Sequence, residues 1–93
     1  MTIYGTQVWK NGELIPWESA TVHVLTHALH YGSSVFEGVR AYATPEGPAV
    51  FRLQAHTRRL LNSAKTARID VAYSEDKLNQ AAADTVASNA PEA

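Results

Sequence analysis

Apolar and polar residues alternate along the first half of the chain, as they do in short strands. Residues 8–15 contain an Asn-Gly pair between two such runs, and Asn-Gly tolerates the positive φ angles of a type I′ hairpin turn. A second hairpin is predicted from a strand over residues 35–42, a Pro- and Gly-rich turn over 44–48 and a partner strand over 49–52. The first half of the chain therefore predicts two β-hairpins.

The segment between the two hairpins predicts one short helical turn. Residues 21–25 are rich in β-branched residues and read as strand-like or extended. Thr26 is a suitable helix cap, residues 27–31 form the turn, and Gly32 stands at the usual C-terminal glycine position.

The hydrophobic period changes to that of a helix at Leu53. Positions at helical spacing form one inward stripe: Leu53, His56, Leu60, Leu61, Ala64 and Ala67. Ser74 caps a second helix that has acidic residues in its first turn, and the inward positions of this helix are mostly alanine. The order of elements predicts an α+β domain, in which the β-hairpins form a small sheet with helices packed on it.

Composition narrows the class of protein. The chain has 93 residues, of which 45% are apolar and 18% are charged, so it predicts one globular domain with a thin core. A net charge of -1 predicts no attraction to nucleic acid or to anionic membranes. No cysteine is present, and neither a secretory signal nor a run of membrane-spanning length is recognisable. The expectation is a soluble, cytoplasmic protein.

The most distinctive segment, residues 27–42, combines aromatic residues with charge. Tyr31 and Phe36 flank a Gly-Ser-Ser step, and Glu37 and Gly38 follow inside the predicted strand. Glycine in a strand marks a bulge or the close approach of another group, so this segment predicts a wall of a small-molecule pocket. The alternatives are that the aromatics are ordinary core residues, and that Glu37 pairs with Arg40 or another cation instead of acting as an acid or base.

Two adjacent arginines, Arg58 and Arg59, lie on the first predicted long helix. An arginine fork suits phosphate, because it donates two directed, charge-assisted hydrogen bonds. The alternative, that both are solvated surface residues, stays open. Arg59 lies nearer the edge of the buried stripe and is the better candidate to reach a cleft.

Neither the histidines nor the lysines predict a catalytic centre. His23, His27 and His30 have spacings that can converge on a metal, but no clustered carboxylate or thiol supports them, so packing or hydrogen bonding is favoured and no metal is expected. The three lysines, Lys10, Lys65 and Lys77, all lie in polar settings. None of them is therefore expected to serve as a nucleophile.

The run over residues 24–42, Val-Leu-Thr-His-Ala-Leu-His-Tyr-Gly-Ser-Ser-Val-Phe-Glu-Gly-Val-Arg-Ala-Tyr, closely resembles the N-terminal segment of branched-chain amino acid aminotransferases. These are fold-type IV enzymes that use pyridoxal phosphate. The resemblance extends to residues 9–13, 47–52, 56–60 and 63–65, and so covers nearly the whole chain.

This resemblance implies roles for individual residues. The arginine that matches Arg59 binds the phosphate of pyridoxal 5'-phosphate. The phenylalanine that matches Phe36 lines the pocket for the substrate side chain, and the tyrosine that matches Tyr31 reaches the pocket of the neighbouring subunit of a homodimer or higher homo-oligomer. Gly38 matches a position where a side chain would intrude on the substrate, and Arg40 matches a residue near the pocket mouth.

The resemblance further implies that residues 1–93 form the small N-terminal domain, incomplete here, of a longer enzyme of branched-chain amino acid biosynthesis. The complete enzyme would transfer the amino group of leucine, isoleucine or valine to 2-oxoglutarate. Its cofactor-binding lysine would lie in a larger domain, so this chain alone is expected to be inactive. D-amino acid aminotransferase, aminodeoxychorismate lyase and a non-catalytic binding or dimerisation module are the alternatives.

Overall fold

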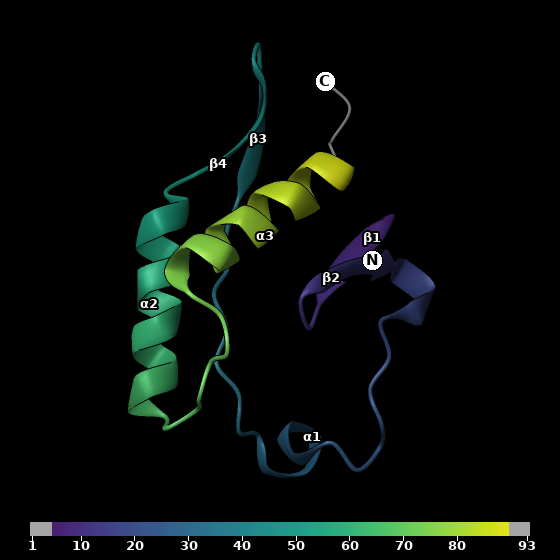
Figure 1. Cartoon of the computed structure of the whole chain (residues 1–93), viewed down its shortest axis with the longest axis vertical. Helices are drawn as coiled ribbons and strands as arrows, with labels where there is room; N and C mark the ends of the chain where they lie inside the picture. Colours follow the sequence, from purple (N-terminus) through teal and green to yellow (C-terminus); the bar gives the residue numbers. More distant parts are fainter. Residues whose placement is uncertain (1–4, 90–93) are drawn as a thin grey trace.

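Two β-hairpins and two fourteen-residue helices form most of the regular structure in the computed structural model, which describes residues 5–89. In chain order the elements are β1 (Gln7–Lys10), β2 (Glu13–Pro16), the 3-10 helix η1 (Trp17–Ser19), α1 (His27–Tyr31), β3 (Ala41–Thr44), β4 (Gly47–Val50), α2 (Leu53–Thr66) and α3 (Glu75–Ser88). Figure 1 shows α3 between α2 and the first hairpin, with α1 on a long connection away from both long helices. The α+β class is confirmed.

The first hairpin forms as its sequence predicts. β1 pairs antiparallel with β2, with Val8 opposite Ile15. Asn11 and Gly12 have φ angles of 51° and 101°, which are the positive values that a tight hairpin turn requires.

The second hairpin is shorter than predicted, and the strand expected over residues 35–42 is wrong for its first six residues. β3 begins only at Ala41, and β4 starts two residues earlier than expected, at Gly47. The Thr44 hydroxyl closes the turn by donating to the Gly47 carbonyl at 2.5 Å. At the other end, the Phe51 N–H still donates to the Arg40 carbonyl at 2.8 Å, but Arg52 has a left-handed φ of 52° and α2 begins directly after it, so the pairing stops there.

The two hairpins form two separate two-stranded sheets rather than the single small sheet that was expected. Helix α3 contacts both β1 and β4 and so connects them. At its end, Asn89 Oδ1 accepts hydrogen bonds from the backbone N–H groups of Thr6 and Gln7 at 2.5 and 2.9 Å, and Nδ2 donates to the Gln7 carbonyl at 2.9 Å. One amide side chain therefore joins the last turn of α3 to the first strand.

The short helix is confirmed over residues 27–31, and Gly32 ends it with a left-handed φ of 65°. Thr26 stands at the N-cap position, but its hydroxyl donates to the His23 carbonyl at 2.7 Å and caps nothing. Residues 21–25 contain no strand. Their contacts are hydrogen bonds such as those from the Leu25 N–H to His23 Nδ1 and from Lys10 Nζ to the Thr21 carbonyl.

The two long helices follow their predicted signals. The Ser74 side chain accepts a hydrogen bond from the Lys77 N–H at 3.1 Å, which confirms the cap of α3. Between the helices, the Thr57 hydroxyl donates to Asn79 Oδ1 at 2.5 Å. This hydrogen bond links α2 directly to α3.

The hydrophobic core is as small as the composition predicts. Within residues 5–89, only Ala64, Ala81 and Thr57 are buried, and no large side chain is fully buried. Many large apolar side chains are instead exposed, and most of them lie between residues 22 and 42. None of the helices in the described part of the chain has the length and apolar character needed to span a bilayer.

Replacing Asn89 should loosen the link between α3 and β1. We expect Asn89→Ala to lower the free energy of unfolding by about 1–3 kcal/mol, because several backbone groups lose their partner. Asn62→Ala on the exposed side of α2 is the matched control and should change it by less than about 0.5 kcal/mol. Urea unfolding followed by tryptophan fluorescence measures both, and equal effects would contradict the role assigned to Asn89.

The exposed apolar segment should make the isolated chain marginally stable or self-associating. Leu25, Tyr31 and Phe36 are 74%, 75% and 87% exposed. Light scattering over a range of protein concentrations should show association that weakens when Leu25 and Phe36 are both replaced by serine. A monomer that unfolds cooperatively at high temperature would be the opposite result.

Candidate functional site

One face of α2 gathers positive charge around a hollow of about 320 Å³, which is lined by Arg52, Ala55, His56 and Arg59. Ala55 and His56 lie four and three residues before Arg59 and therefore share one side of α2 with it, and Arg52 stands at the N-cap of the helix. Two guanidinium groups and a small alanine give the hollow both charge and space. This combination suits an anion.

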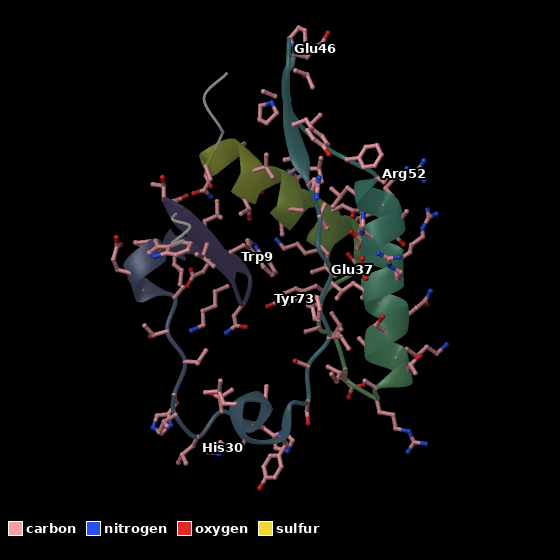
Figure 2. All side chains as sticks on the ribbon, turned by 180° about the vertical axis from the view of Figure 1, so that it is seen from behind. Trp9, His30, Glu37, Glu46, Arg52 and Tyr73 are labelled. Carbon is pink, nitrogen blue, oxygen red and sulfur yellow. The ribbon has the colours of Figure 1, made fainter. Side chains whose placement is uncertain are left out.

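Glu37 lies beside this face, on the segment that leads into β3 (Figure 2). Its carboxylate accepts three hydrogen bonds from Arg59, from Nε at 3.0 and 3.1 Å and from Nη2 at 2.8 Å. His56 Nδ1 lies 2.8 Å from the same Oε1 atom. Glu37 therefore pairs with Arg59 and His56. The alternative that Glu37 pairs with a cation is confirmed, but the cation is Arg59 and not Arg40.

The hydrogen bonds from Arg59, and then that from His56, lower the pKa of Glu37 to about 2 against the opposing effect of burial. The carboxylate in turn raises the pKa of Arg59. An ionised carboxylate only accepts hydrogen bonds, so His56 must carry a proton on Nδ1 and donate it. Glu37 at neutral pH is thus a fixed negative charge, poorly suited to act as a general acid.

The two adjacent arginines are equally exposed, with side chains 66% and 67% accessible, so exposure does not distinguish them. They differ in partners. Arg58 points to the start of α3, where Nε donates to Glu75 at 3.0 Å, whereas Arg59 lines the hollow. Arg58 lines a different hollow of about 630 Å³ together with Arg52, so both arginines reach a hollow and the choice of Arg59 stays a prediction.

A second, apolar groove of about 410 Å³ lies between the hairpins and the long helices. Phe36 and Arg40 both line it, together with Trp9 of β1 and residues of α2 and α3. Phe36 is nevertheless 87% exposed, so it lies at the rim and is not a core aromatic. The prediction of an apolar wall in this segment agrees with the groove.

The remaining candidates from the sequence lie outside this groove. Tyr31 is 75% exposed on α1, where its ring lies 4.5 Å from that of His27. A Cβ atom added at Gly38 would meet nothing within 4 Å, so no group among the described residues approaches it closely. The roles implied for Tyr31, Gly38, Phe36, Arg40 and Arg59 toward substrate and cofactor stay predictions.

The histidines near α1 make local contacts, as favoured from the sequence. His23 Nδ1 accepts from the Leu25 N–H at 3.0 Å, and His30 Nε2 donates to the Val24 carbonyl at 2.7 Å. Within residues 5–89, no three His, Cys, Asp or Glu side chains are grouped to hold a metal ion. Lys10 Nζ donates to the Thr21 carbonyl, so it has a structural contact.

Two residues of the hollow, Arg52 and His56, carry no chemical motif of their own in the sequence. His56 is identified by its helical spacing from Arg59, whereas Arg52, at the N-cap and outside the helix, has no such signal. No local signal identifies Glu37 as the partner of His56 and Arg59, because it lies 19 residues before His56 and 22 before Arg59.

Comparison with known proteins identifies the family. A family model described as Amino-transferase class IV matches residues 34–93, which is more than half of the chain. The chain belongs to the class IV aminotransferases. The match includes the whole of α2 and thus the positively charged hollow.

Individual class IV aminotransferases resemble this chain closely. It is 56% identical to the branched-chain-amino-acid aminotransferase of Pseudomonas aeruginosa over 82 residues, 88% of this chain and 27% of that protein. The solved structure of the Escherichia coli branched-chain amino acid aminotransferase matches with a TM-score of 0.88 and 49% identity, over 92% of this chain and 28% of that one. The T.th. enzyme of the same name matches with a TM-score of 0.88 and 46% identity, over 92% of this chain and 29% of that one.

The structures of the T.th. enzyme include complexes with N-(5'-phosphopyridoxyl)-L-glutamate and with 4-methylvaleric acid. The present chain spans little more than a quarter of the length of each of these class IV aminotransferases.

The Glu37 cluster should make stability depend on pH in the acid range. The folded pKa of about 2 lies below the usual 4.5, so the unfolded state binds more protons between these values and stability rises with pH there. The stabilisation from Glu37 is complete above pH 4.5 and is lost as the pH falls toward 2. The melting temperature of the native chain should therefore exceed that of Glu37→Gln at pH 4.5, and this difference should shrink as the pH falls toward 2.

The guanidinium group of Arg59, the main cause of the low pKa of Glu37, is needed for this dependence. When Arg59 is replaced by glutamine as well, Glu37→Gln should change the melting temperature by less, and this change should vary less with pH. A difference that is constant down to pH 2 would show that Glu37 is not held as an ion in the fold.

Proposed function

We propose that this chain is the N-terminal part of a pyridoxal phosphate-dependent branched-chain amino acid aminotransferase. The complete enzyme transfers the amino group of leucine, isoleucine or valine to 2-oxoglutarate. The observation that carries the proposal is identity of 51–56% with branched-chain aminotransferases over 88% of this chain.

The ligands of a related structure support the substrate class. The similar T.th. enzyme binds 4-methylvaleric acid, a carboxylic acid with the carbon skeleton of leucine. In this chain Phe36 presents an almost fully exposed ring at the rim of an apolar groove. We propose that this ring contacts the branched side chain of the substrate, and that Arg40, in the same groove, lies near the pocket mouth.

The donor groups of the hollow fit a phosphate. Arg59 is two-thirds exposed, positively charged and already oriented by Glu37, and a guanidinium group matches the geometry of phosphate oxygens. We propose that Arg59 binds the phosphate of pyridoxal 5'-phosphate. When bound, this cofactor acts as the electron sink of the reaction, and the protein supplies orientation and electrostatics.

The other parts of the site would come from elsewhere. We propose that a larger domain of the complete protein provides the lysine that binds the cofactor, because Lys10, Lys65 and Lys77 do not match it. Tyr31, exposed on α1, would reach the site of a second subunit in a homodimer or higher homo-oligomer. Gly38 would leave room for the substrate, and the enzyme would act in the cytoplasm in branched-chain amino acid biosynthesis.

Expression of the complete protein tests the proposal. The purified protein should transfer amino groups from leucine, isoleucine and valine to 2-oxoglutarate, whereas the 93-residue chain should neither do so nor retain pyridoxal phosphate after dialysis. A preference for D-alanine, or lyase activity on aminodeoxychorismate, would favour another class IV enzyme. Retained cofactor on the short chain would contradict the assignment of the lysine to another domain.

Phe36→Ala in the complete protein tests the substrate-contacting role. Loss of the apolar contact should lower kcat/KM for leucine by about 10- to 100-fold, with a smaller loss for alanine, whose side chain is too short to use it. Val71→Ala, a partly exposed apolar residue between α2 and α3, is the control and should change neither value. Equal losses for leucine and alanine would contradict a role of Phe36 in selecting side chains.

A further inference from the structure

We propose that Glu37 is the positioning residue of the phosphate site: it holds one edge of the Arg59 guanidinium group so that the opposite edge is presented to the phosphate. This inference rests on the proposed function, since it takes Arg59 as the phosphate-binding group. It adds a role for an acidic residue that is otherwise unsuited to an anion site.

The first step is the division of the arginine donors. A guanidinium group has five N–H donors in one plane. Glu37 engages only Nε and Nη2, and among the described residues no hydrogen bond is formed by Nη1. Both N–H groups of Nη1 and one of Nη2 therefore stay available on the edge that Glu37 does not cover.

The second step is that the holding group is itself fixed. The Glu37 side chain is only 11% exposed, whereas that of Arg59 is 67% exposed. His56, one turn before Arg59 on α2, binds Oε1 of the same carboxylate at 2.8 Å. The carboxylate thus has two anchors on one helix, and the guanidinium group that it holds extends toward solvent.

The third step concerns charge. A carboxylate near a phosphate site is unfavourable unless cations outweigh it. Here the guanidinium groups of Arg52 and Arg59 both line the hollow, together with the imidazole of His56. The low pKa of Glu37 keeps its proton off near neutral pH, so the pair with Arg59 persists while the hollow keeps a net positive charge.

The neighbouring pair provides a matched contrast. Arg58 also uses Nε to bind a carboxylate, that of Glu75, but through one hydrogen bond only, and it lines a different hollow from the one that Arg59 lines. The two glutamates thus have similar chemistry and differ in whether the arginine they hold faces the anion site.

The experiment uses the complete protein, prepared without cofactor, and measures equilibrium binding of pyridoxal 5'-phosphate and of pyridoxal by absorbance. Glu37→Gln should raise the Kd for pyridoxal 5'-phosphate by about two- to tenfold, the loss expected when one long side chain must be immobilised on binding. The Kd for pyridoxal, which has no phosphate, should stay the same. Glu75→Gln is the control and should leave both values unchanged.

Further variants separate positioning from a purely structural effect. Glu37→Asp keeps the carboxylate and should recover part of the lost affinity. His56→Gln releases one anchor and should give a smaller loss with the same preference for the phosphorylated ligand. These two variants decide the matter if Glu37→Gln does not fold, and a loss that is equal for both ligands would overturn the inference.

Arg59→Gln distinguishes this inference from the proposed function. If Arg59→Gln does not weaken binding of pyridoxal 5'-phosphate relative to pyridoxal, the assignment of the phosphate to Arg59 fails, and the inference fails with it. If Arg59→Gln weakens binding and Glu37→Gln does not, only the positioning role is overturned. Tighter binding by Glu37→Gln would mean that the carboxylate competes with the phosphate, and would also overturn it.

Discussion

The carboxylate of Glu37 is the point at which the segment before β3 is joined to α2. Residues 35–40 belong to no strand, and besides the hydrogen bond from the Phe51 N–H to the Arg40 carbonyl, this segment is held by the ion pair with Arg59 and the hydrogen bond from His56. The same bonds orient the guanidinium group that lines the hollow. Local folding and the geometry of the candidate anion site therefore depend on one side chain.

Polar bonds of this kind have unusual weight because the described part of the chain buries so little. Only two alanines and Thr57 are buried, and the Thr57 hydroxyl is itself bonded to Asn79 across the two long helices. Asn89 bonds the end of α3 to β1. Each link specifies which elements meet, while apolar burial contributes less here than in a domain of larger core. Many large apolar side chains of this chain are exposed. The chain also spans only about a quarter of the length of the relatives it matches.

Those features that depend on nearby residues were predictable from the sequence. The Asn11-Gly12 turn, the Ser74 cap and helix α2 each follow from a signal within a few positions, and all three are confirmed. Of the inward stripe predicted for α2, Ala64 is buried, whereas Ala67 is exposed at the C-cap. The strand predicted over 35–42 is present only from Ala41, because the left-handed Arg52 and the start of α2 end the partner strand just after the bond between Phe51 and Arg40. The pairing of Glu37 with Arg59 could not be foreseen for a similar reason: it joins groups 22 residues apart.

Arg52 shows how backbone and site can favour different residues at one position. Its left-handed φ of 52° costs a residue with a side chain about 1 kcal/mol, a cost that glycine does not have. Glycine there would ease the passage from β4 into α2, but it would also remove a positive charge from the hollow and the contact of the guanidinium with the Phe51 ring, 5.4 Å away. A substitution that relieves the backbone at this position would thus make the hollow less attractive to anions, and gains in stability here would come at the expense of charge.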